Sequence, residues 1–393
     1  MVTALFPPSI GGIQSHTLRL AQKLVAKGVA VTVVTRLGPG LATYEEMEGV
    51  AVHRVGLAAR VPPAAGSIAF IAAAAAAIVR LAPRTDVVHA HQLLSPTTAS
   101  LLAAALARRP IVLNPHACGD IGDVGQLSRS AIGRARLRAA VLVADAFVAV
   151  SRPIRDELLG AGVAPRQVWS IANGVDADRF RPATPEQRAA LRRTLGLGAG
   201  PLAVYTGRLA REKGGDVLLD AVPALRARIP AARVCLVGTG AEEASLRAQA
   251  SRLGIADAVV FAGGVADASP YLRAGDAAVL PSRTEGMPVA LLEGMACALP
   301  CVATAVGGSR EVLADGETGW LVPAERPERL GAALADALSG GATAAARGEA
   351  ARAHVLAHST LDLVADRFLA LYRALVAQRG RGAAPTAAST VAR

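Results

Sequence analysis

The chain contains 393 residues, of which 52% are hydrophobic but only 3% aromatic, and its formal net charge is +11. A chain of this length exceeds what one hydrophobic core usually supports, so we expect two domains and a tail. The scarcity of aromatic residues and the lack of a recognised binding motif argue against nucleic-acid binding, and the scattered cysteines argue against a zinc site.

Short β-branched runs alternate with Ala/Leu/Arg stretches of helical length, a pattern typical of parallel sheets covered on both faces. In the first half we predict strands at residues 2–6, 30–35, 50–55, 86–89, 110–113, 146–150 and 167–171. In the second half we predict strands at residues 202–206, 233–237, 258–261, 276–280 and 300–303. The two strand–helix series predict an α/β protein with two separate sheets.

The segment between the two series, residues 179–201, carries Pro and Gly clusters around a charged helical piece and is interpreted as an interdomain connection and hinge. We therefore predict an N-terminal domain at 1–180 and a C-terminal domain at 181–360. A long helix is predicted at 361–378. The Gly/Ala/Ser/Thr-rich end, 379–393, is predicted to be disordered.

A glycine pair follows the first predicted strand. Gly11 and Gly12 lie in the loop 7–16, which leads into a helix predicted to end at Lys27. Two adjacent glycines let backbone N–H groups approach a ligand phosphate closely. On its own, such a pair more often serves only the shape of a turn.

Two segments of the first half bear on membranes. The longest apolar stretch, residues 68–79, is shorter than the roughly 20 residues of a bilayer-spanning helix, so we interpret it as a buried, Ala-rich helix. Residues 124–140 predict a basic amphipathic helix that could dock on anionic lipid or on a phosphorylated acceptor; a solvated helix face is an equally good interpretation. The arginines of this segment are Arg129, Arg134, Arg136 and Arg138. With no secretion signal at the start of the sequence, we expect a cytoplasmic protein with reduced thiols, peripheral to the inner face of the membrane where this helix docks.

Three histidines follow predicted strands of the first half. His89 and His91 form an H-x-H pair at one strand end, where they could ligate a metal. His116 follows the strand 110–113. A lone histidine in such a place more often has a structural role.

In the second half, the loop 207–214 directly follows the strand 202–206. Open α/β sheets bind ligands at the carboxyl ends of their strands. Arg208 and Lys213 could converge there on a diphosphate, with the guanidinium giving planar two-point contact and the ammonium a compact charge. The structural alternative is a salt-bridged surface loop.

Two more glycine turns follow strands. Gly238 and Gly240 come after the strand 233–237, and Gly263 comes after the strand 258–261. The third glycine of a dinucleotide fingerprint is replaced by Glu243, and the sequence contains no Gly-Lys dipeptide. These departures argue against a nicotinamide oxidoreductase and against a P-loop NTPase.

The segment 281–293 is the most informative one. It predicts a strand ending in a Pro/Gly loop that feeds a helix opened by Pro288, because Pro is favoured at the first helical position. The N-terminus of that helix, with Gly286 and Met287 beside it, would offer a phosphate site. Glu285 in the loop and Glu293 on the second turn would flank the phosphate and contact hydroxyls of a sugar and a ribose. The predicted ligand is therefore a sugar nucleotide.

The same segment resembles the Glu-x7-Glu motif of the retaining glycosyltransferases of family 4. Residues 207–214 resemble the family's G-R-L-x-x-E-K-G signature, and the loop 7–16 resembles its glycine-rich loop at the donor diphosphate. Residues 237–242 and 261–265 resemble the turns that pass near the nucleotide base. The ordered resemblance covers roughly residues 6–322. It implies the GT-B fold, with two Rossmann-like domains facing each other across a deep interdomain cleft, and the last helix crossing back onto the first domain.

The family resemblance also extends to the histidines. His116 matches the active-site His that lies beside the transferred sugar, although the family commonly has Thr where this chain has Asn114. Family members resemble residues 86–91 without binding a metal there, so no metal site is expected. The family often has Glu where this chain has Gln14.

The resemblance implies transfer of a hexosyl group from a nucleoside diphosphate sugar to a hydroxyl of a glycan, glycolipid or small molecule. Configuration would be retained, and no metal or cofactor would be needed beyond the donor substrate. The implied catalytic residues are His116, Arg208, Lys213 and Glu285. The implied donor-binding residues are Gly11, Gly12, Arg208, Lys213, Gly238, Gly240, Gly263, Glu285, Gly286, Met287, Pro288 and Glu293. A sugar-nucleotide epimerase or hydrolase of the same fold, or a non-catalytic sugar-nucleotide-binding protein, is the alternative.

Overall fold

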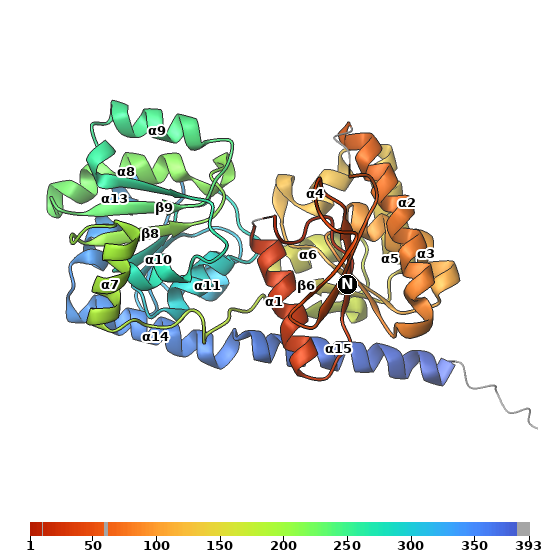
Figure 1. Ribbon diagram of the computed structural model, residues 1–393. Helices are drawn as coiled ribbons and strands as arrows, with labels where there is room; N and C mark the ends of the chain where they lie inside the picture. Colours follow the sequence, from red (N-terminus) through yellow and green to blue (C-terminus); the bar gives the residue numbers. More distant parts are fainter. Residues whose placement is uncertain (10, 59–61, 383–393) are drawn as a thin grey trace, which may run out of the picture.

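The structure is a computed structural model that describes residues 1–9, 11–58 and 62–382. Figure 1 shows two α/β units side by side, with two consecutive helices of the C-terminal region running beneath both. Both units are built on largely parallel sheets, which confirms the predicted α/β class.

The sheet of the N-terminal unit has two parts. One part has the order β1-β3-β2 and the other the order β4-β5-β6-β7, and every pair is parallel except β2 with β3. Val2 alone bridges them, pairing with Val34 on one side and Ala90 on the other. The strands are β1 (Thr32–Arg36), β2 (Tyr44–Met47), β3 (Val50–Val55), β4 (Val88–His91), β5 (Ile111–Asn114), β6 (Ala146–Ala149) and β7 (Val168–Ser170).

The C-terminal unit contains one parallel sheet of six strands in the order β10-β9-β8-β11-β12-β13. The order reverses between β8 and β11, and the carboxyl ends of those two strands form the usual ligand-binding crevice of an open α/β sheet. The strands are β8 (Leu202–Thr206), β9 (Arg233–Val237), β10 (Val259–Gly263), β11 (Ala277–Leu280), β12 (Cys301–Thr304) and β13 (Trp320–Val322).

Helices cover both faces of each sheet. Those of the N-terminal unit are α1 (Gly12–Ala26), α2 (Pro63–Leu81), α3 (Ser95–Ala107), α4 (Asp123–Ser128), α5 (Ala131–Val143) and α6 (Arg152–Gly160). The later helices are α7 (Pro185–Leu195), α8 (Gly215–Arg228), α9 (Glu243–Arg252), α10 (Ser269–Ala274), α11 (Val289–Ala296), α12 (Ser309–Val312), α13 (Pro327–Leu338), α14 (Ala342–His358) and α15 (Leu361–Gly382). Single 3-10 turns lie at Ala82–Arg84, Gly119–Ile121, Pro165–Gln167, Arg211–Lys213 and Ala256–Ala258.

The first predicted strand, residues 2–6, is longer than the pairing that the structure shows. Of residues 2–6, only Val2 forms β-bridges, with the Thr3 N–H donating to the Val34 carbonyl at 3.0 Å, and a turn follows at Pro7 and Pro8. Two short strands were not predicted. The edge strand β2 is acidic and largely solvent-facing, and β13 has only three residues.

The predicted basic helix 124–140 is two helices, α4 and α5. The Ser130 hydroxyl accepts a hydrogen bond from the Gly133 N–H at 3.0 Å, which caps the start of α5 and ends the continuity. A methyl group added at Gly133 would lie 2.1 Å from the Leu127 carbonyl oxygen. The two helices therefore meet closely at a corner.

Helix α2 is not the buried helix that we predicted. Phe70, Ala74, Ala77 and Ile78 face the core, whereas Ile68 on the outer face is 68% exposed. Because Ala and Ile occur on every face, composition could not tell the inner side from the outer side. By length and composition the stretch Pro63–Arg84 could cross a bilayer, a test that core helices of soluble proteins also pass.

The connection between the units is partly helical. Helix α7 lies inside the segment 179–201, capped by Thr184. Arg188 and Arg192 on this helix pair with Asp276 at 3.1 and 2.5 Å, which fastens α7 to the C-terminal unit. The segment 179–184 remains as the extended crossing.

Helix α15 returns to the N-terminal unit (Figure 1). Its buried side chains Phe368 and Leu371 join the cluster that contains Leu20 and Leu24 of α1. The helix continues to Gly382, so residues 379–382 of the predicted disordered tail are helical, and residues 383–393 lie outside the described residues. The domain limits at 180/181 and 360/361 stay a prediction.

Candidate functional site

Two adjoining cavities lie between the units, with volumes of about 450 and 160 Å³. The C-terminal unit contributes the carboxyl ends of β8, β9 and β11, and the N-terminal unit contributes the start of α1 and the loops after β4 and β5. Most of the predicted site residues line one or both cavities: Gly11, Gly12, His116, Arg208, Lys213, Gly238, Glu285, Gly286, Met287, Pro288 and Glu293.

Gly240 and Gly263 do not line either cavity, so the prediction that they contact the ligand is not supported by their position. A methyl group at Gly240 would lie 2.1 Å from the Leu209 carbonyl oxygen, and the Gly263 carbonyl accepts a hydrogen bond from the Gly238 N–H at 2.8 Å. Both glycines support the loops behind the cleft. Their neighbours Thr239 and Val265 line the smaller cavity instead.

Lys213 and Glu285 form an ion pair at 2.7 Å. Lys213 lies in the turn after β8 and Glu285 in the loop after β11, and these strands are neighbours in the sheet. The Ser282 hydroxyl also donates to the Glu285 carboxylate, at 2.6 Å. Gly214 allows the two loops to touch, because a methyl group there would lie 2.0 Å from the Pro281 carbonyl oxygen. The sheet thus places a cation and a buried carboxylate together at the cleft wall.

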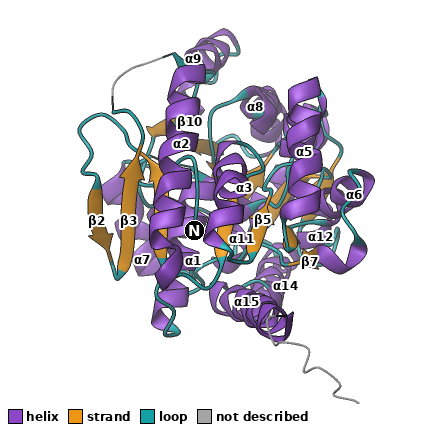
Figure 2. Ribbon diagram, turned by 90° about the vertical axis from the view of Figure 1, so that its right-hand side faces the viewer, coloured by secondary structure: helices purple, strands orange, loops and turns teal. Residues whose placement is uncertain are grey.

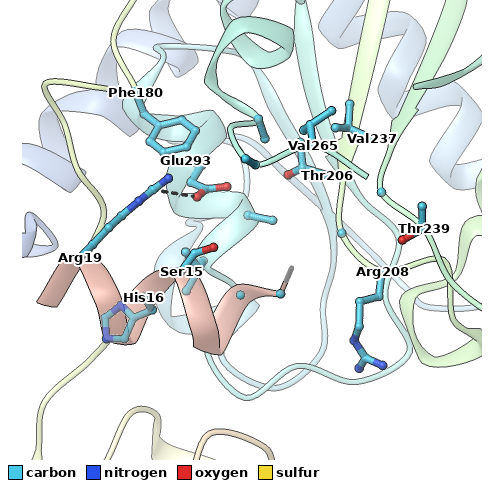
Figure 3. A pocket seen from close by; sticks show the side chains of 18 of the residues that line it. Ser15, His16, Arg19, Phe180, Thr206, Arg208, Val237, Thr239, Val265 and Glu293 are labelled. Atoms are coloured by element: carbon cyan, nitrogen blue, oxygen red, sulfur yellow. Dashed lines mark ion pairs between the residues drawn. The ribbon is translucent and has the colours of Figure 1, made fainter. Parts of the chain in front are cut away.

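Arg208 lines both cavities, and its side chain is 59% exposed. The Tyr205 hydroxyl donates to the Arg208 backbone carbonyl at 2.7 Å, which fixes the loop, while the guanidinium pairs with Glu212 at 2.7 Å. Figure 3 shows the Arg208 side chain pointing away from Glu293. An exposed guanidinium and a partly buried ammonium on the same cleft together suit an anionic ligand such as a diphosphate.

The two units touch at the floor of the cleft. A methyl group added at Gly286 would lie 2.2 Å from the His116 carbonyl oxygen. Beside this contact, the Cys118 thiol donates to the Glu285 carbonyl at 3.3 Å. The loops after β5 and β11 therefore meet backbone to backbone, which a side chain at position 286 would prevent.

Helix α11 begins at Val289, one residue later than predicted, with Pro288 in the capping position. The difference is small because Pro lacks an N–H and can occupy either place without losing a helical hydrogen bond. The start of α11 lines the larger cavity through Pro288, Val289 and Ala290, and Glu293 lies on its second turn.

Sequence reasoning missed Arg19. Its guanidinium lies 3.6 Å from the Glu293 carboxylate and 5.1 Å from the Phe180 ring centroid. Figure 3 shows Arg19 reaching from α1 toward Glu293. Burial raises the pKa of the Glu293 carboxyl to about 7, and the Arg19 charge opposes that rise. Because Arg19 lies two turns beyond Gly12 on the same helix, helical periodicity could have placed it in the cleft.

His116 is 8% exposed and lines the larger cavity. Burial, together with a smaller effect of the nearby His16, lowers the pKa of His116 to about 3, so the imidazole is neutral at pH 7. A neutral imidazole can both donate and accept a hydrogen bond, which suits contact with a sugar hydroxyl.

Comparisons with known proteins agree with this geometry. The family model of "Glycosyltransferase Family 4" matches residues 10–179, and that of "Glycosyl transferases group 1" matches residues 200–340. A GDP-mannose-dependent alpha-(1-6)-phosphatidylinositol monomannoside mannosyltransferase of Mycolicibacterium smegmatis is 33% identical over 90% of this chain and 92% of its own length. A D-inositol 3-phosphate glycosyltransferase of Streptomyces avermitilis is 34% identical over 88% of this chain and 79% of its own length.

Two solved structures share the fold. HepE of Anabaena, in complex with UDP and glucose, gives a TM-score of 0.77 at 21% identity, covering 95% of this chain and 99% of its own. Sucrose-phosphate synthase of Thermosynechococcus elongatus gives a TM-score of 0.77 at 24% identity, covering 96% and 100%. These likenesses confirm the predicted GT-B arrangement.

The raised pKa of Glu293 predicts a pH-dependent stability effect. The folded protein holds this proton up to about pH 7, whereas the unfolded chain releases it near 4.5, so wild-type stability falls as pH rises through that window. Glu293→Gln removes this loss, and we expect the variant to be more stable than wild type by about 1–3 kcal/mol at pH 8 and no more stable near pH 4. Urea unfolding at both pH values measures the difference. Glu243→Gln, on the surface of α9, is the control, and a gain at Glu293 that does not change with pH would contradict the assignment.

Proposed function

The chain belongs to the group 1 glycosyl transferases, glycosyltransferase family 4, and on that premise we propose that it moves a hexosyl group with retention of configuration and without a metal ion. The donor is a nucleoside diphosphate sugar, and the acceptor is a hydroxyl group. The observation that carries the proposal is the Lys213–Glu285 pair at the cleft wall, opposite the glycine pair at the start of α1.

The leaving diphosphate gains negative charge as the glycosidic bond to the sugar breaks. Lys213, Arg208 and the backbone N–H groups at the start of α1 line the cavity where that charge would develop. Preorganised donors and cations of this kind stabilise a transition state without reorganising. The start of α11 adds the positive end of a helix from the other side of the same cavity. Departure of the nucleotide is therefore assisted mainly by electrostatics.

The sugar would lie between His116 and Glu285, which the contact at Gly286 brings to one place. The Glu285 carboxylate accepts hydrogen bonds from sugar hydroxyls, and the neutral His116 orients the ring. The acceptor hydroxyl attacks from the face that the diphosphate leaves, and a phosphate oxygen takes its proton. Glu293 accepts from the ribose hydroxyls, and Arg19 moves away from it when the nucleotide enters.

The acceptor side of the larger cavity is lined by neutral side chains of the N-terminal unit, including Thr3, Gln92 and Asn173. The curated relatives act on a phosphatidylinositol monomannoside and on inositol 3-phosphate, as their names state. We propose a glycan or a lipid-linked polyol as the acceptor of this chain.

A lipid-linked acceptor would bring the protein to the inner face of the membrane. Figure 2 shows α2, α3 and α5 together on one side of the N-terminal unit. Their outward side chains include Ile68, Leu102, Leu106, Ile132 and Leu142, which are 62–84% exposed. Among the four arginines of the predicted basic helix, Arg129, Arg134 and Arg136 donate to Asp120, Ser128 and Thr98, which leaves Arg138 without a hydrogen-bond partner among the described residues. The apolar residues therefore support peripheral contact more strongly than the arginines do.

Removing either cation of the cleft should slow transfer. We expect Lys213→Ala and Arg208→Ala each to lower kcat at least tenfold, about 1.4 kcal/mol or more of barrier. Initial rates with GDP-mannose and with UDP-sugars measure the effect. Arg247→Ala on α9 is the matched control, and near-normal turnover in both cleft variants would reject the site.

The product distinguishes retention from its alternatives. With an α-linked donor we expect an α-linked product by proton NMR, at a rate that excess EDTA leaves unchanged within about twofold, because the cleft cations replace a metal. A β-linked product would overturn retention. Free hexose or an epimerised donor, formed without acceptor, would identify a hydrolase or epimerase.

Membrane contact is tested by vesicle sedimentation. We expect the protein to bind vesicles rich in anionic lipid, more weakly at high salt, and we expect Leu142→Glu to lower binding at least threefold because it places a charge in the apolar face. Arg247→Glu controls for the change in net charge. Equal binding by wild type and Leu142→Glu would exclude α5 from the contact.

A further inference from the structure

The H-x-H pair at the end of β4 plays no part in the donor site described above. His89 and His91 point to the same face of the sheet, because side chains alternate along a strand. They are 2% and 0% exposed. Polar groups this deeply buried are costly unless they form hydrogen bonds, so their partners indicate what they do.

The partner of His91 is His116. The His91 Nδ1 lies 3.0 Å from the His116 Nε2, and the two rings are inclined by only 11°. The sheet fixes this contact: His91 pairs in register with Asn114, and His116 follows two residues later. A loop shift at the end of β5 would break it.

The contact couples the protons of the two rings. A hydrogen bond between neutral imidazoles needs one N–H and one bare nitrogen. Burial keeps both rings neutral, because it lowers the pKa of His91 well below its ordinary value and that of His116 to about 3. If His91 carries its proton on Nδ1, then His116 must carry its own on Nδ1; if His91 does not, then His116 carries it on Nε2.

The other nitrogen of His116, Nδ1, is buried and has no protein hydrogen-bond partner among the described residues. His116 lines the larger cavity, so its buried and unpartnered Nδ1 is the ring nitrogen that remains for a hydrogen bond with a ligand. Whether it donates or accepts is coupled, through the contact at the opposite edge of the ring, to the tautomer of His91.

We propose that His91 is a positioning residue for the transfer reaction, which fixes the tautomer and the ring plane of His116. It thereby sets whether His116 Nδ1 donates to a hydroxyl of the bound sugar or accepts from one. The contact with the sugar rests on the proposed function, whereas the coupling between the two rings does not.

A second layer holds His91 in turn. The His89 ring lies against it with centroids 4.2 Å apart, and the His89 Nδ1 lies 2.7 Å from the Tyr372 hydroxyl on α15. Burial raises the pKa of Tyr372, so its hydroxyl keeps its proton. Helix α15 therefore contacts His89 through Tyr372, and His89 in turn packs against His91.

The geometry of this contact allows substitutions of His91 that either keep or remove its hydrogen bond to His116. The contact is made by Nδ1, which is bonded to Cγ; the amide atoms of Asn are also bonded to Cγ, whereas those of Gln lie one bond further, where Nε2 stands. His91→Asn should therefore preserve the hydrogen bond to His116. His91→Gln and His91→Phe should lose it. Asn and Gln are both neutral amides, so burial of a polar group affects the two variants alike.

The first measurement is the tautomer of His116 without substrate, from long-range 1H–15N spectra of 15N-histidine-labelled protein, with His116→Gln to assign the signals. We expect one tautomer in wild type, and a mixture or the other tautomer in His91→Gln and His91→Phe. His91→Asn is left to the kinetic measurement, because its amide can turn to donate to His116 or to accept from it. The same tautomer in wild type, His91→Gln and His91→Phe would overturn the proposal. Because no substrate is present, failure of the proposed transferase function leaves this result readable.

The second measurement is kinetic. We expect His91→Gln and His91→Phe to lower kcat about tenfold or more with less than about a threefold change in the donor KM, since misorientation costs mainly in the transition state. His91→Asn should keep at least about a third of wild-type kcat. Urea unfolding of each variant identifies any loss of fold. Equal kcat in folded His91→Asn and His91→Gln would assign His91 a purely structural role.

Discussion

A close contact between the two units shapes the cleft, where the backbone at Gly286 meets the carbonyl of His116. A glycine is needed there because any side chain would collide with the opposite loop. The contact brings the loop after β5 against the loop that carries Glu285, whose carboxylate is held by Lys213 and Ser282. Two sheets that share no strand thereby contribute to one site.

The two carboxylates of that site, Glu285 and Glu293, lie in different environments. Glu285 meets its cation at 2.7 Å, whereas Glu293 meets Arg19 at 3.6 Å and has its pKa raised to about 7 by burial. The first carboxylate is paired within its own unit, and the second is paired across the cleft. The histidines are kept neutral by burial, so they act through hydrogen bonds rather than through charge.

The sequence predicted those features that a local pattern determines. The strands β3, β8 and β9 match their predicted limits, because buried β-branched runs end at clear turn residues. The glycines and charges of the sequence also predict the loops after β8, β9 and β11 that line the cleft. The sequence did not predict three features that depend on contacts between distant segments. They are the single-residue bridge at Val2, the exposed face of α2, and the pairing of Arg19 with Glu293. The sequence shows His89 and His91 as a pair, but only the register of β4 with β5 places His91 beside the His116 ring.

The chain passes between the units twice, before α7 and again between α14 and α15, and the two passages are fastened to each other. Val175 donates to the Ser359 carbonyl at 2.9 Å, and the Leu361 N–H donates to the Val175 carbonyl at 3.0 Å. Gly174 permits this approach, since a methyl group there would lie 3.0 Å from the Leu361 nitrogen. The two crossings are therefore joined at one point, and any change in the angle between the units would have to turn about that point or break its two hydrogen bonds.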